Sequence, residues 1–213
     1  LKQILPYLKQ HNISCQAVEI QSLADQAIIR DLLALTRALL HPADRIAWLA
    51  VLRAPWAGLS LSDLHQICSK NPTATLWELL LNCKLQTLST DGQLITQRII
   101  PILKSRFTRY GLQTLPEWIE GTWLALGGPA CVNYAAELEQ AKLFFNLLRK
   151  YQNHDEIIQP DFIESKLQKL YPKPAQQDSQ VEAMTIHKSK GLEFDTVIIP
   201  GLERNLTTDD AKL

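Results

Sequence analysis

Apolar side chains recur every third or fourth position at the start of the chain and predict a helix there. Residues 1–10 are apolar at Leu1, Ile4, Leu5 and Leu8, and Asn12 stands where the helix must stop. A short strand is expected from Ile13 to Val18.

Two more helices are predicted before residue 58. Ser22 with Asp25 three residues later resembles a capping box that opens a helix through Leu40, and His41-Pro42 ends it. Asp44 is expected to cap the next helix, Arg45 to Arg53.

The middle of the chain, from Gly58 to about Lys173, is helical throughout in its apolar pattern. Six helices are expected, the longest near Gln93 to Tyr110 and Asn133 to Gln152. Turn-forming residues separate them at Asn71-Pro72, Asp91-Gly92, Gly111, Gly127-Gly128-Pro129 and His154 to Pro160. No repeat of 20 to 50 residues is evident in this stretch, which disfavours a helical solenoid.

The pattern changes after a polar, proline-containing linker from Tyr171 to Gln180. Val181 to Ile186 and Thr196 to Pro200 have the β-branched character of short strands on either side of a polar turn, HKSKGLEFD. Strand-rich ends around a helical middle predict a mainly α chain with a small α/β part, interrupted by an all-helical insertion.

Composition fits a globular protein but names no partner. Hydrophobic residues make up 46% of the chain and charged residues 21%, which argues against intrinsic disorder. Lys plus Arg and Asp plus Glu number 22 each, so any nucleic-acid contact must be local. The four cysteines have no CxxC pair and are interpreted as reduced, mostly buried side chains rather than zinc ligands, and no apolar run predicts a membrane span.

The turn after Ala183 carries the side chains best suited to chemistry. A strand that leads into His187, Lys188, Ser189 and Lys190 would deliver them to the carboxyl end of a sheet, where open α/β folds place their ligands. Lysines, a hydroxyl and close-approaching glycine backbone suit phosphate oxygens. Beyond them, Glu193 can accept a hydrogen bond from a ribose hydroxyl or orient a cation.

This stretch closely resembles motif V of superfamily 1 helicases of the UvrD, Rep and RecB/AddA type. Residues Thr185 to Phe194, TIHKSKGLEF, fit the pattern T-[LIV]-H-x-[AS]-K-G-L-E-[FW]. The resemblance implies that Thr185 and His187 contact single-stranded DNA phosphates and that Gly191 and Glu193 bind nucleotide. It implies a phosphate contact for Lys188 and Lys190 as well.

A second stretch is similar to the one that leads into the helical insertion of RecB/AddA-like helicases. It runs from Ile28 to Leu64, and the residues that match are Arg30, Asp31, His41, Pro42, Leu52, Arg53, Pro55, Gly58 and Ser60. Together the two resemblances imply a partial RecA-like second lobe over residues 1–57, an all-helical insertion over 58–175 and a return to the lobe over 176–213. Residues 71–177 carry no matching motif.

The resemblance implies a parent that is an ATP-dependent DNA helicase or helicase–nuclease (an exodeoxyribonuclease) of DNA repair and recombination. The sequence holds no GxxxxGK[ST] phosphate loop, no Asp-Glu magnesium motif and no arginine motif beyond motif V. The parent would therefore use ATP and Mg²⁺ with the first lobe, and this fragment is expected neither to hold them nor to hydrolyse ATP at a helicase rate. The abrupt ends also suggest an excised fragment.

The expected partners are single-stranded or duplex DNA and the missing first lobe, in the bacterial cytoplasm, with no membrane contact. The insertion lacks a strong basic stripe, so it would serve protein contacts rather than duplex binding. Arg98, Lys104, Arg106 and Arg109 cluster on one predicted helix, for which a solvated face is favoured over phosphate tracking. The five tryptophans are expected to lie in the core.

Two other hypotheses remain open. A non-catalytic interaction scaffold would retain a degenerate helicase fold without the chemistry. An unrelated all-α protein would require that Val181 to Pro200 form no strands.

Overall fold

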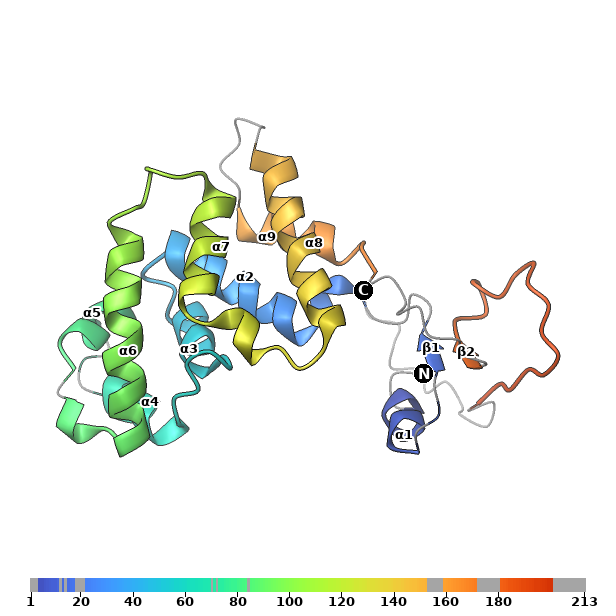
Figure 1. Cartoon of the computed structure of the whole chain (residues 1–213), viewed down its shortest axis with the longest axis horizontal. Coiled ribbons are helices and arrows are strands. Elements are labelled where there is room, and N and C mark those ends of the chain that lie inside the picture. The colour runs from blue at the N-terminus through green and yellow to red at the C-terminus, as the bar shows by residue number, and fades with distance from the viewer. Residues whose placement is uncertain are drawn as a thin grey trace.

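The computed structural model describes residues 4–11, 13, 15–17, 22–69, 71, 73–83, 85–152, 159–171 and 181–200, and these are mainly helical. Helices α2 to α9 form one body, and α1 lies beside a pair of short strands to one side of it (Figure 1). The expectation of a mainly α chain is confirmed at this level.

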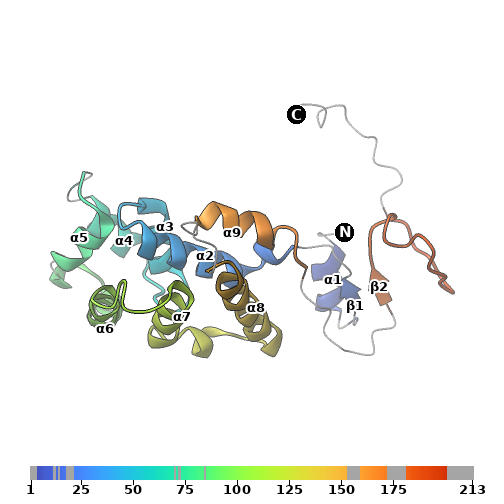
Figure 2. The same cartoon turned by 90° about the horizontal axis from the view of Figure 1, so that it is seen from above.

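Helix α2 (Ala27–Leu40) is the centre of the helical body. It packs against α3 (Arg45–Arg53), α7 (Leu115–Ala125), α8 (Ala135–Gln152) and α9 (Pro160–Leu167). Seen from above, α6 (Thr90–Phe107), α7 and α8 make one layer, and α3, α4 (Leu61–Cys68) and α9 lie on the other side (Figure 2). Because partners cover it from several directions, α2 has an unusually wide apolar surface. Its fully buried side chains are Ile29, Leu32, Leu35 and Ala38.

The start of α2 differs from the prediction. A 3₁₀ turn, Leu23–Asp25, comes first, and the α-helix begins only at Ala27. The expected cap contact exists, since the Ser22 backbone N–H donates to the Asp25 carboxylate at 3.3 Å. Leu23 is fully buried, and its backbone N–H donates to the Leu170 carbonyl at 2.6 Å. This tertiary contact ties the turn to the segment after α9, so the first turn does not join α2.

The next helix boundaries follow the sequence closely. The Asp44 carboxylate accepts from the Ala47 N–H at 2.9 Å and caps α3, whose bounds are those predicted. Six α-helices follow residue 58 within the described residues, as expected: α4, α5 (Leu76–Leu81), α6, α7, α8 and α9. In α8 the predicted stripe is confirmed, with Ala141, Phe144, Phe145 and Leu148 buried and Leu138 packed beside them.

The expected break at Asp91-Gly92 is wrong, because both residues lie in the first turns of α6. The buried Asp63 carboxylate accepts hydrogen bonds from Ser60 Oγ at 2.7 Å and from Ser89 N and Oγ at 2.7 and 2.8 Å. Ser89 Oγ in turn accepts from the Gly92 N–H at 3.0 Å. Burial alone would raise the pKa of Asp63, but these hydrogen bonds outweigh it and hold the pKa below its ordinary value. Asp63 thus joins the starts of α4 and α6.

Two short strands pair across almost the whole length of the chain. Strand β1 (Cys15–Ala17) is parallel to β2 (Val181–Ala183), with Cys15 opposite Val181 and Ala17 opposite Ala183. Helix α1 (Ile4–Gln10) lies against β1. The parts of the predicted strand at Ser14 and Val18, the residues 1–3 of the first helix, and the linker residues 172–180 lie outside the described residues.

Most tryptophans are core residues, as predicted. Trp48, Trp56, Trp118 and Trp123 are at most 4% exposed, and Trp77 packs against the same core. None of the four cysteines is in a disulfide, and each is half-buried rather than fully buried. The domain boundaries at residues 57/58 and 175/176 stay a prediction.

Two helical glycines should respond in opposite ways to alanine. A Cβ on Gly92 would lie 2.7 Å from Asp63 Cγ, whereas a Cβ on Gly121 would lie 3.2 Å from Arg106 Nη1, the end of a flexible side chain. Gly92→Ala should therefore lower the free energy of unfolding by about 1–3 kcal/mol through overpacking. Gly121→Ala should be neutral or raise it by up to about 1 kcal/mol, the helix-propensity gain. Urea titration of both variants decides, and a stabilised Gly92→Ala would contradict the close contact with Asp63.

A second prediction concerns Asp31, a half-buried residue of α2. Burial raises its pKa from 3.8 to about 6, against the opposing effect of the Arg30 guanidinium. The folded state therefore holds this proton more tightly than the unfolded chain, so the contribution of Asp31 to stability is lost as pH rises from about 4 to about 6. Asp31→Asn should be more stable than the wild type above this range, with a difference that shrinks toward pH 4. Thermal melts across the range test this, and a difference that does not vary with pH would rule it out.

Candidate nucleic-acid and nucleotide interface

The turn that carries the predicted site residues follows strand β2 directly. Because β1 and β2 are parallel, their carboxyl ends lie at the same edge, and the chain leaves that edge at residue 184. The segment from there to Pro200 runs outward, away from the helical body, in both views (Figures 1 and 2). The turn is therefore open to a ligand from several sides.

Backbone hydrogen bonds give residues 185–192 a defined shape. The Thr185 carbonyl accepts from the N–H groups of Lys188 at 3.0 Å and Ser189 at 3.2 Å. Ser189 Oγ donates to the Ile186 carbonyl at 2.9 Å, and the Leu192 N–H donates to the Ser189 carbonyl at 3.0 Å. Two consecutive turns thus fold this stretch back on itself. The second requires the left-handed φ of +85° at Gly191, a conformation that glycine adopts without strain.

All six predicted site residues are brought together on this turn, and each is exposed. They are Thr185, His187, Lys188, Lys190, Gly191 and Glu193. Three of them are cationic or can become so, and Ser189 supplies a hydroxyl among them. No atom outside the immediate backbone lies within 4 Å of where a Cβ of Gly191 would be, so an anion can approach the backbone closely. The arrangement suits phosphate oxygens; the separate roles of the six residues stay predictions.

The predicted strand from Thr196 to Pro200 is wrong, because the structure assigns no strand to these residues. Its apolar side chains are exposed instead, with Val197 at 67% and Ile198 at 83%. A β-branched run forms a strand only beside a partner with which it can exchange backbone hydrogen bonds. Among the described residues, β2 pairs with β1 alone, and no further strand lies beside it.

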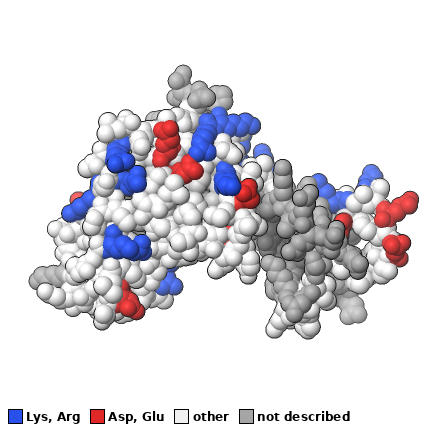
Figure 3. Space-filling model, viewed as in Figure 1, with Lys and Arg blue, Asp and Glu red and all other residues white. Residues whose placement is uncertain are grey.

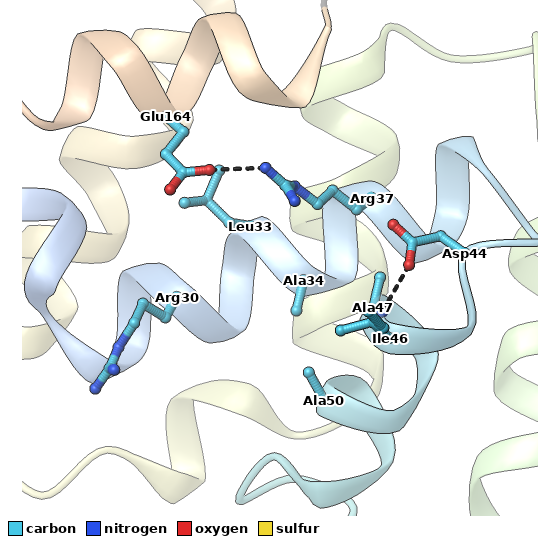
Figure 4. Close-up of a pocket in the computed structure, with 9 residues that line it drawn as sticks. All are labelled: Arg30, Leu33, Ala34, Arg37, Asp44, Ile46, Ala47, Ala50 and Glu164. Atoms are coloured by element: carbon cyan, nitrogen blue, oxygen red, sulfur yellow. Dashed lines mark hydrogen bonds and ion pairs between the residues drawn. The ribbon is translucent and has the colours of Figure 1, made fainter. Parts of the chain in front are cut away.

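A pocket of about 270 Å³ lies elsewhere, between α2, α3 and α9 (Figure 4). Several of its polar groups already have partners. Arg37 Nη2 lies 2.6 Å from Asp161 and 2.7 Å from Glu164, and Asp44 caps α3. The floor is formed by small and apolar side chains, Leu33, Ala34, Ala47 and Ala50. The pocket therefore resembles a helix junction more than a ligand site, and none of the predicted site residues lines it.

Metal ligands and membrane-crossing helices are both absent from the described part of the chain. No group of three or more His, Cys, Asp and Glu side chains is placed there to hold a metal ion. No helix within the described ranges is both long enough and apolar enough to cross a bilayer.

Replacement of Gly191 should affect the turn and not the core. At a φ of +85°, Gly191→Ala introduces backbone strain of about 1–2 kcal/mol, although no neighbouring atom would clash. Amide hydrogen exchange should speed up at Leu192, whose N–H bonds to Ser189, while the melting temperature of the helical body stays unchanged. Gly191→Asn is the matched control, because asparagine tolerates this φ better. Equal exchange rates in all three proteins would argue against the turn.

Comparison with known proteins is consistent with this geometry. An ATP-dependent helicase/nuclease subunit of Natranaerobius thermophilus is 25% identical over 206 residues, which cover 86% of this chain and 16% of the relative. The protein of the same description from Enterococcus faecalis is 24% identical over 224 residues, with 97% and 18% covered. The chain thus spans less than a fifth of the length of these relatives. The family model of the UvrD-like helicase C-terminal domain matches residues 1–209, and the chain belongs to this family.

Proposed function

We propose that this chain forms part of the second motor lobe of an ATP-dependent DNA helicase, in which residues 185–194 couple nucleotide binding to grip on single-stranded DNA. One observation carries the proposal: the whole motif lies on one exposed, hydrogen-bonded turn directly after a strand of a parallel pair. The carboxyl edge of a parallel sheet is where α/β folds bind their ligands. Family membership supports the assignment, and the relatives' names supply the class of reaction.

The DNA side of the turn would consist of Thr185 and His187, with Lys188 and Lys190 as neighbouring cations. Hydroxyl, imidazole N–H and ammonium groups all donate to phosphate oxygens, and such contacts bind the DNA backbone without reading its sequence. All four side chains are exposed, so a strand can reach them without rearrangement of the core. Grip on any sequence is what a translocating motor requires.

The nucleotide side would consist of Gly191 and Glu193. Gly191 leaves its backbone open to a phosphate or ribose, and the exposed Glu193 carboxylate can accept a hydrogen bond from a ribose hydroxyl. ATP therefore fits this end of the turn. Magnesium would be held by groups of the first lobe in the parent. Bound ATP supplies the free energy of the cycle, and this turn would only sense it.

The parallel strands would then belong to a RecA-like lobe that the helical body interrupts. Parallel neighbours need a long crossover connection, and here α2 to α9 lie between β1 and β2 in the chain. Residues 1–57 and 176–213 would be the two parts of the lobe, and 58–175 the insertion. Movement of the lobe against the missing first lobe would transmit the nucleotide state to the DNA-binding residues.

The test pairs DNA binding with ATP hydrolysis. His187→Ala with Lys190→Ala should weaken binding of oligothymidine to this chain and flatten the dependence of log K on log salt by about 0.7 for each phosphate that is no longer bound. In the full-length parent the same pair should abolish DNA-stimulated ATPase. Lys142→Ala is the control, since that lysine pairs with Glu139 on α8.

The outcomes separate the competing functions. Unchanged DNA affinity and unchanged ATPase in the double variant would refute the proposed role of the turn. DNA binding without any ATPase in the wild-type parent would instead favour the non-catalytic scaffold.

A further inference from the structure

The end of the α6–α7 hairpin carries a cationic segment that the motif V turn does not explain. Residues 104–114, KSRFTRYGLQT, hold Lys104, Arg106 and Arg109 and no acidic residue. Within the described residues, none of these three cations is in an ion pair. Lys and Arg side chains gather over the upper part of α6 and toward α7 on the face drawn in Figure 3, with acidic side chains beyond them over α7. This segment is called the hairpin tip below.

The structure separates these cations from Arg98, which the sequence grouped with them. Arg98 Nη1 donates to the Leu126 carbonyl at 3.0 Å and Nη2 to the Trp56 carbonyl at 2.5 Å, so its guanidinium joins α6 to two loops. Arg106 lies over Gly121 of α7. Lys104 and Arg109 remain exposed. Only the end of the predicted stripe is therefore available to a phosphate backbone.

An aromatic side chain stands among the available cations. Tyr110 is 65% exposed, and it contacts Trp118 in an edge-to-face arrangement, with ring centroids 5.1 Å apart. Such a contact covers at most one face of the tyrosine ring. The neighbouring Leu112 is 79% exposed. Exposed aromatic rings next to cations are the composition of single-strand binding surfaces, where bases stack and phosphates pair with lysine and arginine.

The hairpin tip is also held in place. A chain of ring contacts leads from Trp48, which is fully buried, through Trp77, Phe107 and Trp118 to Tyr110. Trp118 Nε1 donates to the Arg106 carbonyl at 2.7 Å. The Leu112 N–H donates to the Arg109 carbonyl at 3.1 Å across Gly111, whose φ is +78°. A preformed surface of this kind loses little conformational entropy when it binds.

The nearest acidic side chains on α7 are already engaged. Glu117 accepts a hydrogen bond from the Thr114 N–H at 3.1 Å and so closes the cap of α7. Glu120 is paired with Arg149 of α8. Neither carboxylate pairs with Lys104 or Arg109.

We propose that the hairpin tip is a second nucleic-acid contact, in which Tyr110 stacks on an unpaired base while Lys104 and Arg109 bind the flanking phosphates. The proposal rests on the proposed function only for nucleic acid as the partner, and its geometry is independent of the motif V turn. An acidic protein segment would use the two cations but would gain nothing from a stacking ring.

The experiment measures binding of fluorescein-labelled oligothymidine to the 213-residue chain by fluorescence anisotropy. Tyr110→Ala should weaken binding about tenfold, as loss of one base–aromatic stack does, and Tyr110→Phe should restore most of it. Lys104→Ala with Arg109→Ala should reduce the slope of log K against log salt by about 1.4. A duplex of the same length should be sensitive to the cation pair but not to Tyr110→Ala. Lys142→Ala with Lys169→Ala removes the same charge away from the hairpin tip and should leave binding near the wild-type value.

Each result decides the matter. Circular dichroism melts of every variant establish that the helical body is folded. Loss of binding in His187→Ala with Lys190→Ala, together with wild-type binding in the tip variants, would overturn this proposal and leave the proposed function standing. No measurable binding of oligothymidine by the wild-type chain would also overturn it. Equal loss in Tyr110→Ala and Tyr110→Phe, or poly-glutamate binding that matches oligothymidine, would do so in favour of an acidic protein partner.

Discussion

Burial of helix α2 is the interaction on which the rest of the helical body depends. Its apolar surface contacts α3, α7, α8 and α9, so helices from both halves of the sequence share one core. Each of these partners buries its own apolar stripe only because α2 is there to receive it. Arg37 adds a polar link at the edge, where it pairs with Asp161 and Glu164 of α9. The helical body can thereby close on itself, although α2 and α9 lie far apart in the sequence.

That closure has a consequence for the motif V turn. Since α9 returns to the side of α2 and the Leu23 N–H reaches the Leu170 carbonyl, the chain entering the helical body lies next to the chain leaving it. Segments brought this close can pair without a further entropic cost of loop closure. Strands β1 and β2 do so in parallel, and the turn then starts at the shared edge. The helical body thus positions the turn from a distance, with no side chain of its own in it.

Polar contacts that no sequence pattern reveals explain where the sequence predictions failed. Gly92 has the signature of a helix break, but the glycine is needed because the Asp63 carboxylate lies where a Cβ would be. Arg98 belongs by spacing to a cationic stripe, yet two backbone carbonyls engage it. Tyr110 carries no signal in the sequence, because one tyrosine in a helical pattern is usually packed. Its exposure follows from the left-handed turn at Gly111 and from the position of Trp118, and both depend on the fold.

The sequence by itself determined the number of helices after residue 58, the cap at Asp44, and the ten-residue motif with its six site residues. These features are local: spacing, capping hydrogen bonds and a contiguous motif depend on neighbours within a turn or two. The tertiary structure alone decided that β1 pairs with β2, that residues 196–200 form no strand, and that Lys104, Arg109 and Tyr110 share one exposed end of a hairpin. Each of these depends on which distant segment lies alongside, because a strand needs a partner's backbone and a side chain's exposure is set by what packs over it.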